Sequence, residues 1–142
     1  MDLNSKFPAI SDLRSRARKR IPHFAWEYLD SATGDESTLH RNRSALDGVH
    51  FVPRGLRGEI TPKLATTFLG QAYSAPFGIA PVGMSGLMWP GAEKALASFA
   101  AEAKIPYGMS TVATVTPEDV APHLSDMGWF QMYPPRDETI RN

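Results

Sequence analysis

The sequence predicts an α/β protein in which parallel strands and helices alternate after a group of short helices. The first observation is the apolar segment 77–81 (FGIAP), which runs into a small-residue turn and then a helix, as strands of parallel sheets do. The second is that this order of strand and helix recurs from Pro76 onward. The third is that residues 1–75 carry helix caps and breakers but little strand pattern.

The N-terminal region, residues 1–75, is expected to form short helices and then a small hairpin. Ser11 can cap a helix over 13–20, which ends before Pro22. Pro22 suits the first turn of a second helix, which is expected to end at residues 33–34. There follow a predicted helix over 35–46, an irregular stretch over 49–62 rich in glycine and proline, and a hairpin formed by 65–69 and 71–73 about Gly70.

Residues 76–142 are expected to hold three strand-and-helix units. The strands are predicted at 77–81, 107–111 and 129–133. The helices are predicted at 91–104, from Thr116 onward and at 136–142. The helix after Thr116 has the strongest local signal, because a capping threonine, Pro117 at the first helical position and an acid three residues after the cap agree.

The length of the chain bears on how this sheet is completed. Right-handed crossovers would make the strands parallel. A parallel sheet needs helices on both faces or closure into a barrel, and a (β/α)8 barrel takes about 250 residues. Because the chain has 142 residues, we expect it to be the N-terminal part of a larger protein.

Composition excludes several functions. Lys plus Arg and Asp plus Glu both number 15, so the formal net charge is zero and nucleic-acid binding is not expected. The sequence contains no cysteine, which excludes disulfides, thiolate metal sites and a cysteine nucleophile, and no metal is expected. No segment is as apolar and long as a signal-peptide core or a membrane span, so we expect a cytoplasmic protein that binds a small molecule.

The candidate ligand-binding groups lie where consecutive strands end, which is where barrel enzymes place their active sites. They are the backbone of Pro81, Val82 and Gly83, the hydroxyl of Ser110, and the side chains of Gln131 and Tyr133. Backbone amides over 82–84, a hydroxyl and a carboxamide offer the donors and acceptors that suit a flat heterocycle. Structural roles remain open for each: an ordinary connection for the turn, a turn cap for Ser110, and a buried amide bonded to backbone for Gln131.

Motifs along most of the chain occur in an order typical of one family. They are Pro22 with Tyr28 six residues later, Thr38 and Asn42, Pro53-Arg54, the IAPVG run, Met109-Ser110-Thr111, and Phe130-Gln131-Met132-Tyr133. From about Phe7 to Asn142, the sequence resembles the FMN-dependent 2-hydroxy acid dehydrogenases and oxidases, which include L-lactate dehydrogenase, mandelate dehydrogenase and glycolate oxidase. The resemblance implies a partial domain over 1–142, the N-terminal part of a (β/α)8 TIM barrel with short helices before its first three strands.

The resemblance also implies FMN as the cofactor and a role for each candidate residue. The roles are flavin packing for Pro81, Val82 and Gly83, hydrogen bonding to FMN for Ser110 and Gln131, substrate binding for Tyr28 and Tyr133, and support of catalysis for Tyr133. Phenols are protonated at neutral pH, so both tyrosines could donate hydrogen bonds to an anionic substrate. Without the resemblance, Tyr28 would be assigned to a helix core together with Phe24.

The catalytic base histidine and the carboxylate-binding arginines of the family have no counterpart in this sequence. Family members take them from later strands, and none of the four histidines matches the base: His23, His40, His50 and His123. Val112 stands where glycolate oxidases carry a tryptophan. The smaller residue favours lactate or an aromatic 2-hydroxy acid over glycolate.

The resemblance therefore implies oxidation of a lactate-like or mandelate-like L-2-hydroxy acid to the 2-keto acid by the full-length form, with this chain alone inactive. We expect the full-length form to be a cytoplasmic homo-oligomer, with peripheral membrane association left open. Two alternatives remain. One is a non-catalytic barrel fragment that works by assembly with a companion chain, and the other is a different FMN barrel enzyme, such as a relative of isopentenyl-diphosphate isomerase.

Overall fold

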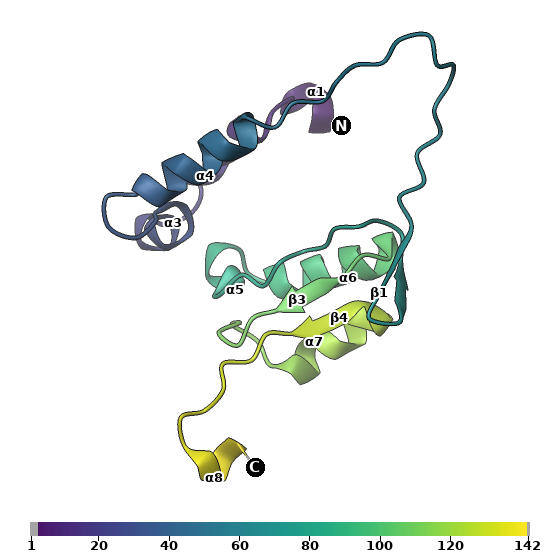
Figure 1. Cartoon of the computed structure of the whole chain (residues 1–142). Coiled ribbons are helices and arrows are strands. Elements are labelled where there is room, and N and C mark those ends of the chain that lie inside the picture. Colours follow the sequence, from purple (N-terminus) through teal and green to yellow (C-terminus); the bar gives the residue numbers. More distant parts are fainter. Residues whose placement is uncertain (1–2, 142) are drawn as a thin grey trace. The chain divides into compact units, whose positions relative to one another are not determined.

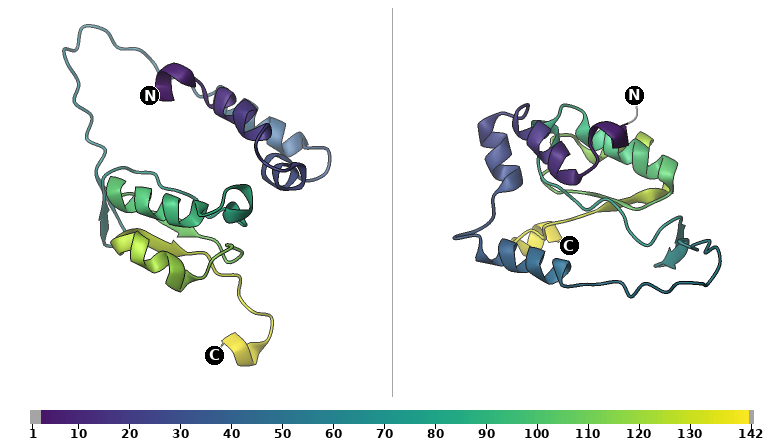
Figure 2. Two further views of the ribbon diagram at one scale, coloured as in Figure 1. Left: turned by 180° about the vertical axis from the view of Figure 1, so that it is seen from behind. Right: turned by 90° about the horizontal axis from the view of Figure 1, so that it is seen from above.

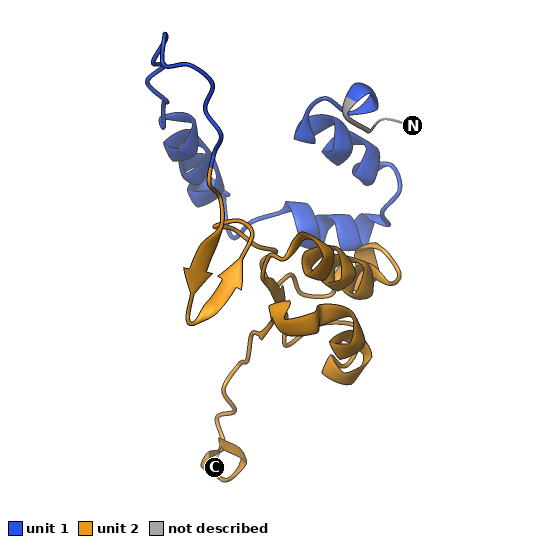
Figure 3. Cartoon of the chain, turned by 90° about the vertical axis from the view of Figure 1, so that its right-hand side faces the viewer, with its two compact units in different colours: residues 1–62 blue, residues 63–142 orange. Residues whose placement is uncertain are grey.

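A computed structural model describes residues 3–141 of the chain, shown in Figure 1 and Figure 2. The chain divides into two compact units, Met1–Pro62 and Lys63–Asn142, which Figure 3 colours blue and orange. This boundary precedes the hairpin, so the hairpin groups with the strand-and-helix units. No helix among the described residues is both long and apolar enough to cross a lipid bilayer.

The first unit consists of helices joined by short turns. They are α1 (Leu3–Lys6), α2 (Ile10–Arg18), α3 (His23–Asp30) and α4 (Ser37–Asp47). The sequence predicted α2, α3 and α4 to within a few residues but did not predict α1.

Two helix starts differ from the prediction. α2 begins at Ile10, so Ser11 is not its cap. Instead, the Asp12 carboxylate accepts a hydrogen bond from the backbone N–H of Ala9 at 3.1 Å, which satisfies a donor at the start of the helix. Pro22 is the N-cap residue of α3 rather than its first helical residue, since its ψ of 144° is extended.

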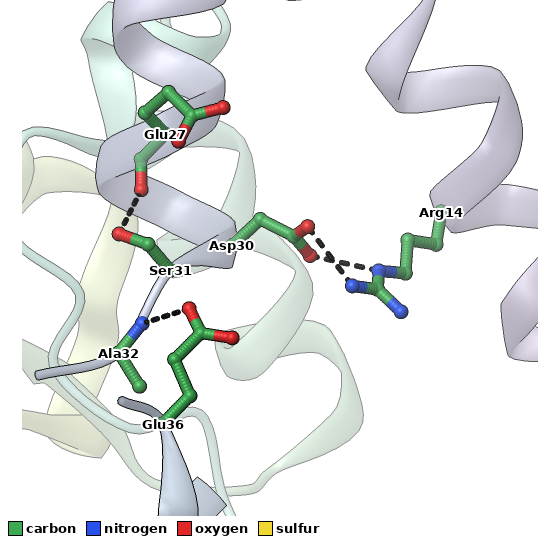
Figure 4. A network of polar contacts seen from close by, with 6 residues as sticks. All are labelled: Arg14, Glu27, Asp30, Ser31, Ala32 and Glu36. Atoms are coloured by element: carbon green, nitrogen blue, oxygen red, sulfur yellow. Dashed lines mark hydrogen bonds and ion pairs between the residues drawn. The ribbon is translucent and has the colours of Figure 1, made fainter. Parts of the chain in front are cut away.

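Polar contacts fix the end of α3 and join it to α2 (Figure 4). Arg14 donates two hydrogen bonds to the Asp30 carboxylate, at 2.7 and 2.9 Å. The same guanidinium holds the pKa of Asp30 below its usual value. α3 ends at Asp30 rather than at residues 33–34, because Ser31 is extended and its hydroxyl donates to the Glu27 carbonyl.

The hairpin follows a long irregular connection. Between residues 48 and 65 the described chain forms no helix or strand, as its glycine and proline content predicted. β1 (Thr66–Phe68) and β2 (Gln71–Tyr73) then pair antiparallel. The two residues that connect them, Leu69 and Gly70, have φ values of 49° and 82°. Two successive positive φ values give the twist that a two-residue hairpin turn requires.

The rest of the second unit has parallel strands covered by helices. Its elements are α5 (Ser85–Met88), α6 (Ala92–Ala103), β3 (Tyr107–Met109), α7 (Pro117–Leu124), the 3-10 turn η1 (Ser125–Met127), β4 (Gly128–Phe130) and α8 (Glu138–Arg141). β3 and β4 are parallel, with Tyr107 beside Gly128 and Met109 beside Phe130. Figure 1 shows α6 and α7 along these strands, and the two helices also contact each other. The predicted α/β class is confirmed.

The strand predicted at 77–81 is reduced to one parallel bridge between Ile79 and Tyr107. The Ile79 N–H donates to the Pro106 carbonyl, and the Ile79 carbonyl accepts from the Gly108 N–H, both at 2.8 Å. The next bond of such a ladder would need an N–H at position 81, and Pro81 has none. The ladder therefore stops after a single residue.

The core of the second unit lies between the strands and the helices α6 and α7. Its buried residues include Ala97, Ala100, Ile105, Tyr107, Met109 and Val120. The alanines let α6 lie close to the strands, as its composition predicted. Because residues alternate along a strand, Gly108 lies on the face of β3 opposite to Tyr107 and Met109.

The start of α7 agrees with the prediction. The Thr116 hydroxyl accepts a hydrogen bond from the Asp119 N–H at 3.3 Å, and Pro117 is the first helical residue. The cap satisfies one of the backbone donors that every helix leaves unpaired at its N-terminus.

Replacing Thr116 by alanine should lower the free energy of unfolding by about 1 kcal/mol, the usual cost of losing a side-chain N-cap. For a unit of this size, the melting temperature should fall by about 4–8 °C, which far-UV circular dichroism measures. The control is Thr61→Ala in the irregular connection, which should leave the melting temperature unchanged. Equal effects of the two substitutions would contradict the assignment of Thr116 as the cap.

Candidate active site

The carboxyl ends of β3 and β4 bring together residues that are far apart in the sequence. The Gln131 N–H donates to the Met109 carbonyl at 2.9 Å, which continues the parallel register by one step. Ser110 and Gln131 therefore follow neighbouring strands at the same level. This is the placement that the sequence predicted for them.

The Ser110 hydroxyl caps the turn that ends β3. Ser110 is only 4 % exposed, and its Oγ accepts a hydrogen bond from the Val112 N–H at 3.2 Å. The Ser110 carbonyl accepts another from the Ala113 N–H at 3.1 Å. This turn makes β3 shorter than the predicted strand over 107–111. Because Oγ acts as an acceptor in this bond, the turn does not use the hydroxyl proton.

The turn over 81–83 carries backbone donors that the protein does not use. Among residues 3–141, no hydrogen bond engages the N–H of Val82 or of Gly83. Met84 differs from the expectation, because its N–H already donates to the Val112 carbonyl at 2.9 Å. The turn thus offers the amides of Val82 and Gly83 to a ligand, but not that of Met84.

The Thr111 hydroxyl joins the end of β3 to the segment after β4. It donates to the Gln131 carbonyl and accepts from the Tyr133 N–H at 3.1 Å. These bonds hold the backbone over 131–133 after β4 has ended at Phe130, short of the predicted 129–133.

In the described part of the chain, the Gln131 carboxamide has no hydrogen-bond partner. It is therefore not a buried amide satisfied by backbone.

The two tyrosines expected at the substrate lie in different units. Tyr133 is 57 % exposed in the second unit, and Tyr28 is 49 % exposed on α3 of the first. Phe24, one turn before Tyr28, is 64 % exposed. The buried residues of α3 are instead Ala25 and Trp26, so Tyr28 is not a helix-core residue. Its meeting with Tyr133 at a substrate stays a prediction.

A buried carboxylate beside these turns was not predicted from the sequence. Glu93, in the first turn of α6, is 1 % exposed. Its Oε1 accepts hydrogen bonds from the Gly86 N–H at 2.9 Å, the Thr114 N–H at 3.0 Å and the Thr114 hydroxyl at 2.9 Å. Its Oε2 is buried and has no hydrogen-bond partner among the described residues.

The sequence did contain a signal for this residue. Glu93 shares the buried side of α6 with Ala97 and Ala100, at the spacing of one helix face. Burial raises the pKa of Glu93, but the hydrogen bonds from Thr114 and Gly86 lower it by more. The pKa of Glu93 therefore lies below its usual value, and the carboxylate is ionised at neutral pH.

The opposite, amino ends of the strands carry apolar contacts. A hollow of about 330 Å³ lies there between the hairpin and residues 75–78. Phe68 and Trp129 lie beside each other with ring centroids 5.9 Å apart, and Trp129 Nε1 donates to the Tyr73 hydroxyl at 2.9 Å. Residues 3–141 contain no group of three or more side chains able to hold a metal ion.

These features define a parallel α/β protein with its free polar groups at the carboxyl ends of its strands. Residues 17–142 match the model of the family described as FMN-dependent dehydrogenase. The chain belongs to this family, whose members use FMN.

Known relatives and structures agree with this assignment. The chain is 37 % identical over 129 residues to an L-lactate dehydrogenase of Xanthomonas euvesicatoria pv. vesicatoria (strain 85-10), covering 91 % of this chain and 33 % of that protein. An L-lactate dehydrogenase of Vibrio parahaemolyticus serotype O3:K6 is 36 % identical, with 91 % and 34 % covered. The chain therefore spans about a third of the length of the curated relatives it matches.

Two solved structures are also similar to this chain. A mandelate oxidase matches with a TM-score of 0.86 and 32 % identity, covering 95 % of this chain and 39 % of that one. An oxidised active mutant of (S)-mandelate dehydrogenase matches with a TM-score of 0.79 and 34 % identity, covering 87 % of this chain and 35 % of that one.

The groups at the strand ends fit a flavin. An isoalloxazine ring is flat and has donors and acceptors along its edge. At its strand ends, the described chain has two unused backbone amides over 82–83, a hydroxyl proton on Ser110 and an unpaired carboxamide on Gln131.

The depressed pKa of Glu93 predicts a pH-dependent stability. Its carboxylate stabilises the fold above the unfolded-state pKa of about 4.3, and this contribution is lost as the pH falls through the lower folded-state pKa. We therefore expect Glu93→Gln to lower the free energy of unfolding at neutral pH, and the deficit to shrink below about pH 4.3. Urea unfolding at a series of pH values measures it.

The control for this prediction is Glu102→Gln, which removes the same charge from an exposed position on the same helix. This variant should unfold like the wild type at each pH. A deficit for Glu93→Gln that stays constant down to about pH 3 would contradict the assigned protonation state.

Proposed function

We propose that the protein to which this chain belongs oxidises an L-2-hydroxy acid to the 2-keto acid with FMN. The chain supplies the N-terminal part of a (β/α)8 barrel, in which the Ile79 segment, β3 and β4 are the first three strands. The family assignment supports this proposal, as do the parallel order of the strands and the relatives' greater length.

The observation that carries the proposal is the set of unused donors at the carboxyl ends. In the proposed complex, the backbone of Pro81, Val82 and Gly83 packs against the flavin ring, while the Ser110 hydroxyl and the Gln131 carboxamide hydrogen-bond its edge. When bound, FMN supplies the redox chemistry by accepting two electrons from the substrate.

The tyrosines bind and orient the substrate. The exposed phenol of Tyr133 donates a hydrogen bond to the substrate oxygen that changes from hydroxyl to carbonyl, and Tyr28 donates to the carboxylate. Neither residue is the proposed base. The base and the carboxylate-binding arginines belong outside this chain, so the chain alone is inactive.

The proposed substrate is lactate-like or mandelate-like. Val112 follows the Ser110 turn and is 40 % exposed, and its small side chain leaves room for a substituent larger than that of glycolate. The names of the relatives, L-lactate dehydrogenase and mandelate oxidase, support the same two substrates.

A chimera tests the proposal. Residues 17–142 replace the aligned segment of the Xanthomonas L-lactate dehydrogenase. The purified chimera should contain FMN, and L-lactate or (S)-mandelate should bleach its flavin absorption under anaerobic conditions. The 142-residue chain with added FMN should show no turnover. A folded chimera without FMN, or turnover by the chain alone, would contradict the proposal.

Substituting Tyr133 by phenylalanine in this chimera should lower kcat by about 10²-fold, the usual effect of removing one hydrogen-bond donor at a reacting oxygen. Steady-state kinetics measures it. The matched control is Tyr73→Phe, which removes a phenol oxygen bonded to Trp129 at the amino ends of the strands. That control should keep kcat. Equal kcat values for Tyr133→Phe and the parent would remove Tyr133 from the proposed site.

A second function, assembly with a companion chain, is favoured by the outer edge of β4. Among the described residues β4 pairs only with β3. Phe130 at its end and Met132 and Tyr133 beyond it are 53 %, 65 % and 57 % exposed. Co-expression with the C-terminal two thirds of the Xanthomonas enzyme tests it. A yellow, active complex supports assembly, whereas two halves that purify separately would contradict it.

A further inference from the structure

Glu93 contacts both of the loops that border the proposed flavin position. Through Oε1 it accepts from Gly86, the second residue of the short helix α5 in the loop after the first strand segment, and from the backbone and hydroxyl of Thr114, in the loop after β3. The same loops meet where the Met84 N–H donates to the Val112 carbonyl at 2.9 Å. One carboxylate oxygen thus links the loops that follow two neighbouring strands.

Packing alone does not account for a carboxylate at this place. Burying a charge costs free energy, and a well-packed apolar side chain often serves stability equally well. Glu93 is 1 % exposed and its Oε2 has no partner in the described part of the chain, so the hydrogen bonds to Oε1 are what hold the carboxylate in place. What the carboxylate adds is an oxygen able to accept several donors from two loops at once.

Gly86 shows how closely the two loops approach. A Cβ at position 86 would lie 1.9 Å from Thr114 Oγ1 and 2.8 Å from Glu93 Oε2. Both distances are too short for a side-chain carbon, so only glycine fits. The spacing of the loops is therefore set by direct contact around the carboxylate.

We propose that Glu93 is a positioning residue for flavin binding, which holds Gly86 and Thr114 on one oxygen and thereby sets the spacing between the turn at 81–83 and Ser110. This inference rests on the proposed function, which assigns a flavin to those two places. Gly86 and Thr114 lie a few residues after the two flavin-facing groups, so a shift of either loop moves one group relative to the other. Glu93 itself does not touch the flavin.

The test measures FMN dissociation constants of the chimera by fluorescence titration, below the melting temperature of every variant. Glu93→Ala should weaken FMN binding by about tenfold or more, the loss associated with one hydrogen bond to a charged group. Glu93→Gln should lie between this variant and the parent, because its amide oxygen still accepts. The control Glu102→Ala, an exposed position on α6, should bind FMN like the parent.

A merely structural role gives another pattern. It lowers the melting temperature of Glu93→Ala but leaves its FMN dissociation constant and its flavin absorption spectrum unchanged, and this result would overturn the inference. Gly86→Ala gives a second test that keeps the carboxylate, and it should also weaken FMN binding. Its control is Gly55→Ala, where a Cβ would meet no atom within 4 Å.

The outcomes separate the inference from the proposed function. A parent chimera that binds no FMN contradicts the proposed function and, with it, the inference. A parent that binds FMN while all variants bind equally contradicts only the inference.

Hydrogen exchange of the 142-residue chain tests the geometry without FMN: the amides of residues 86 and 114 should exchange about tenfold faster in Glu93→Gln than in Glu102→Gln. Equal exchange overturns the linking role of Glu93.

Discussion

The loops after the first two strand segments are held together by a carboxylate that solvent does not reach. Glu93 is anchored by α6, whose Ala97 and Ala100 are packed in the core, so the loops are tied to a helix that packs against the strands. The hydrogen bonds from Gly86 and Thr114 keep this carboxylate ionised despite its burial. The arrangement makes the loop spacing depend on the core rather than on solvent-exposed contacts.

Two hydroxyl groups fix the backbone where β3 and β4 end. Ser110 closes its own turn by accepting from Val112, and Thr111 bridges to the backbone at Gln131 and Tyr133. The amides of Val82 and Gly83, by contrast, take part in no hydrogen bond among the described residues.

Much of this fold could be predicted from local sequence signals. The cap at Thr116, the turn at Gly70 and the helix over 91–104 depend on residues near in sequence, and the structure confirms all three. The strand at 77–81 was overestimated, because apolar content does not show that Pro81 must end the ladder. Glu93 was missed for a similar reason: its partners lie in two other loops, and only their meeting in space makes a buried acid stable.

For the candidate site, too, the sequence predicted some contacts between the strand ends and not others. Ser110 and Gln131 share a level because parallel register places them there, which strand order alone can predict. The amide of Met84 could not be excluded from sequence, since its acceptor, the Val112 carbonyl, lies in another loop. The roles of Tyr28 and Tyr133 still depend on the resemblance to the family.

The most direct test of the central claim is a crystal structure of the chimera with FMN bound. The account predicts that the flavin ring packs on the backbone of residues 81–83, with the Ser110 Oγ and the Gln131 carboxamide within about 3 Å of polar atoms on the ring edge. A flavin bound away from these strand ends, with Ser110 and Gln131 out of hydrogen-bonding reach, would contradict it.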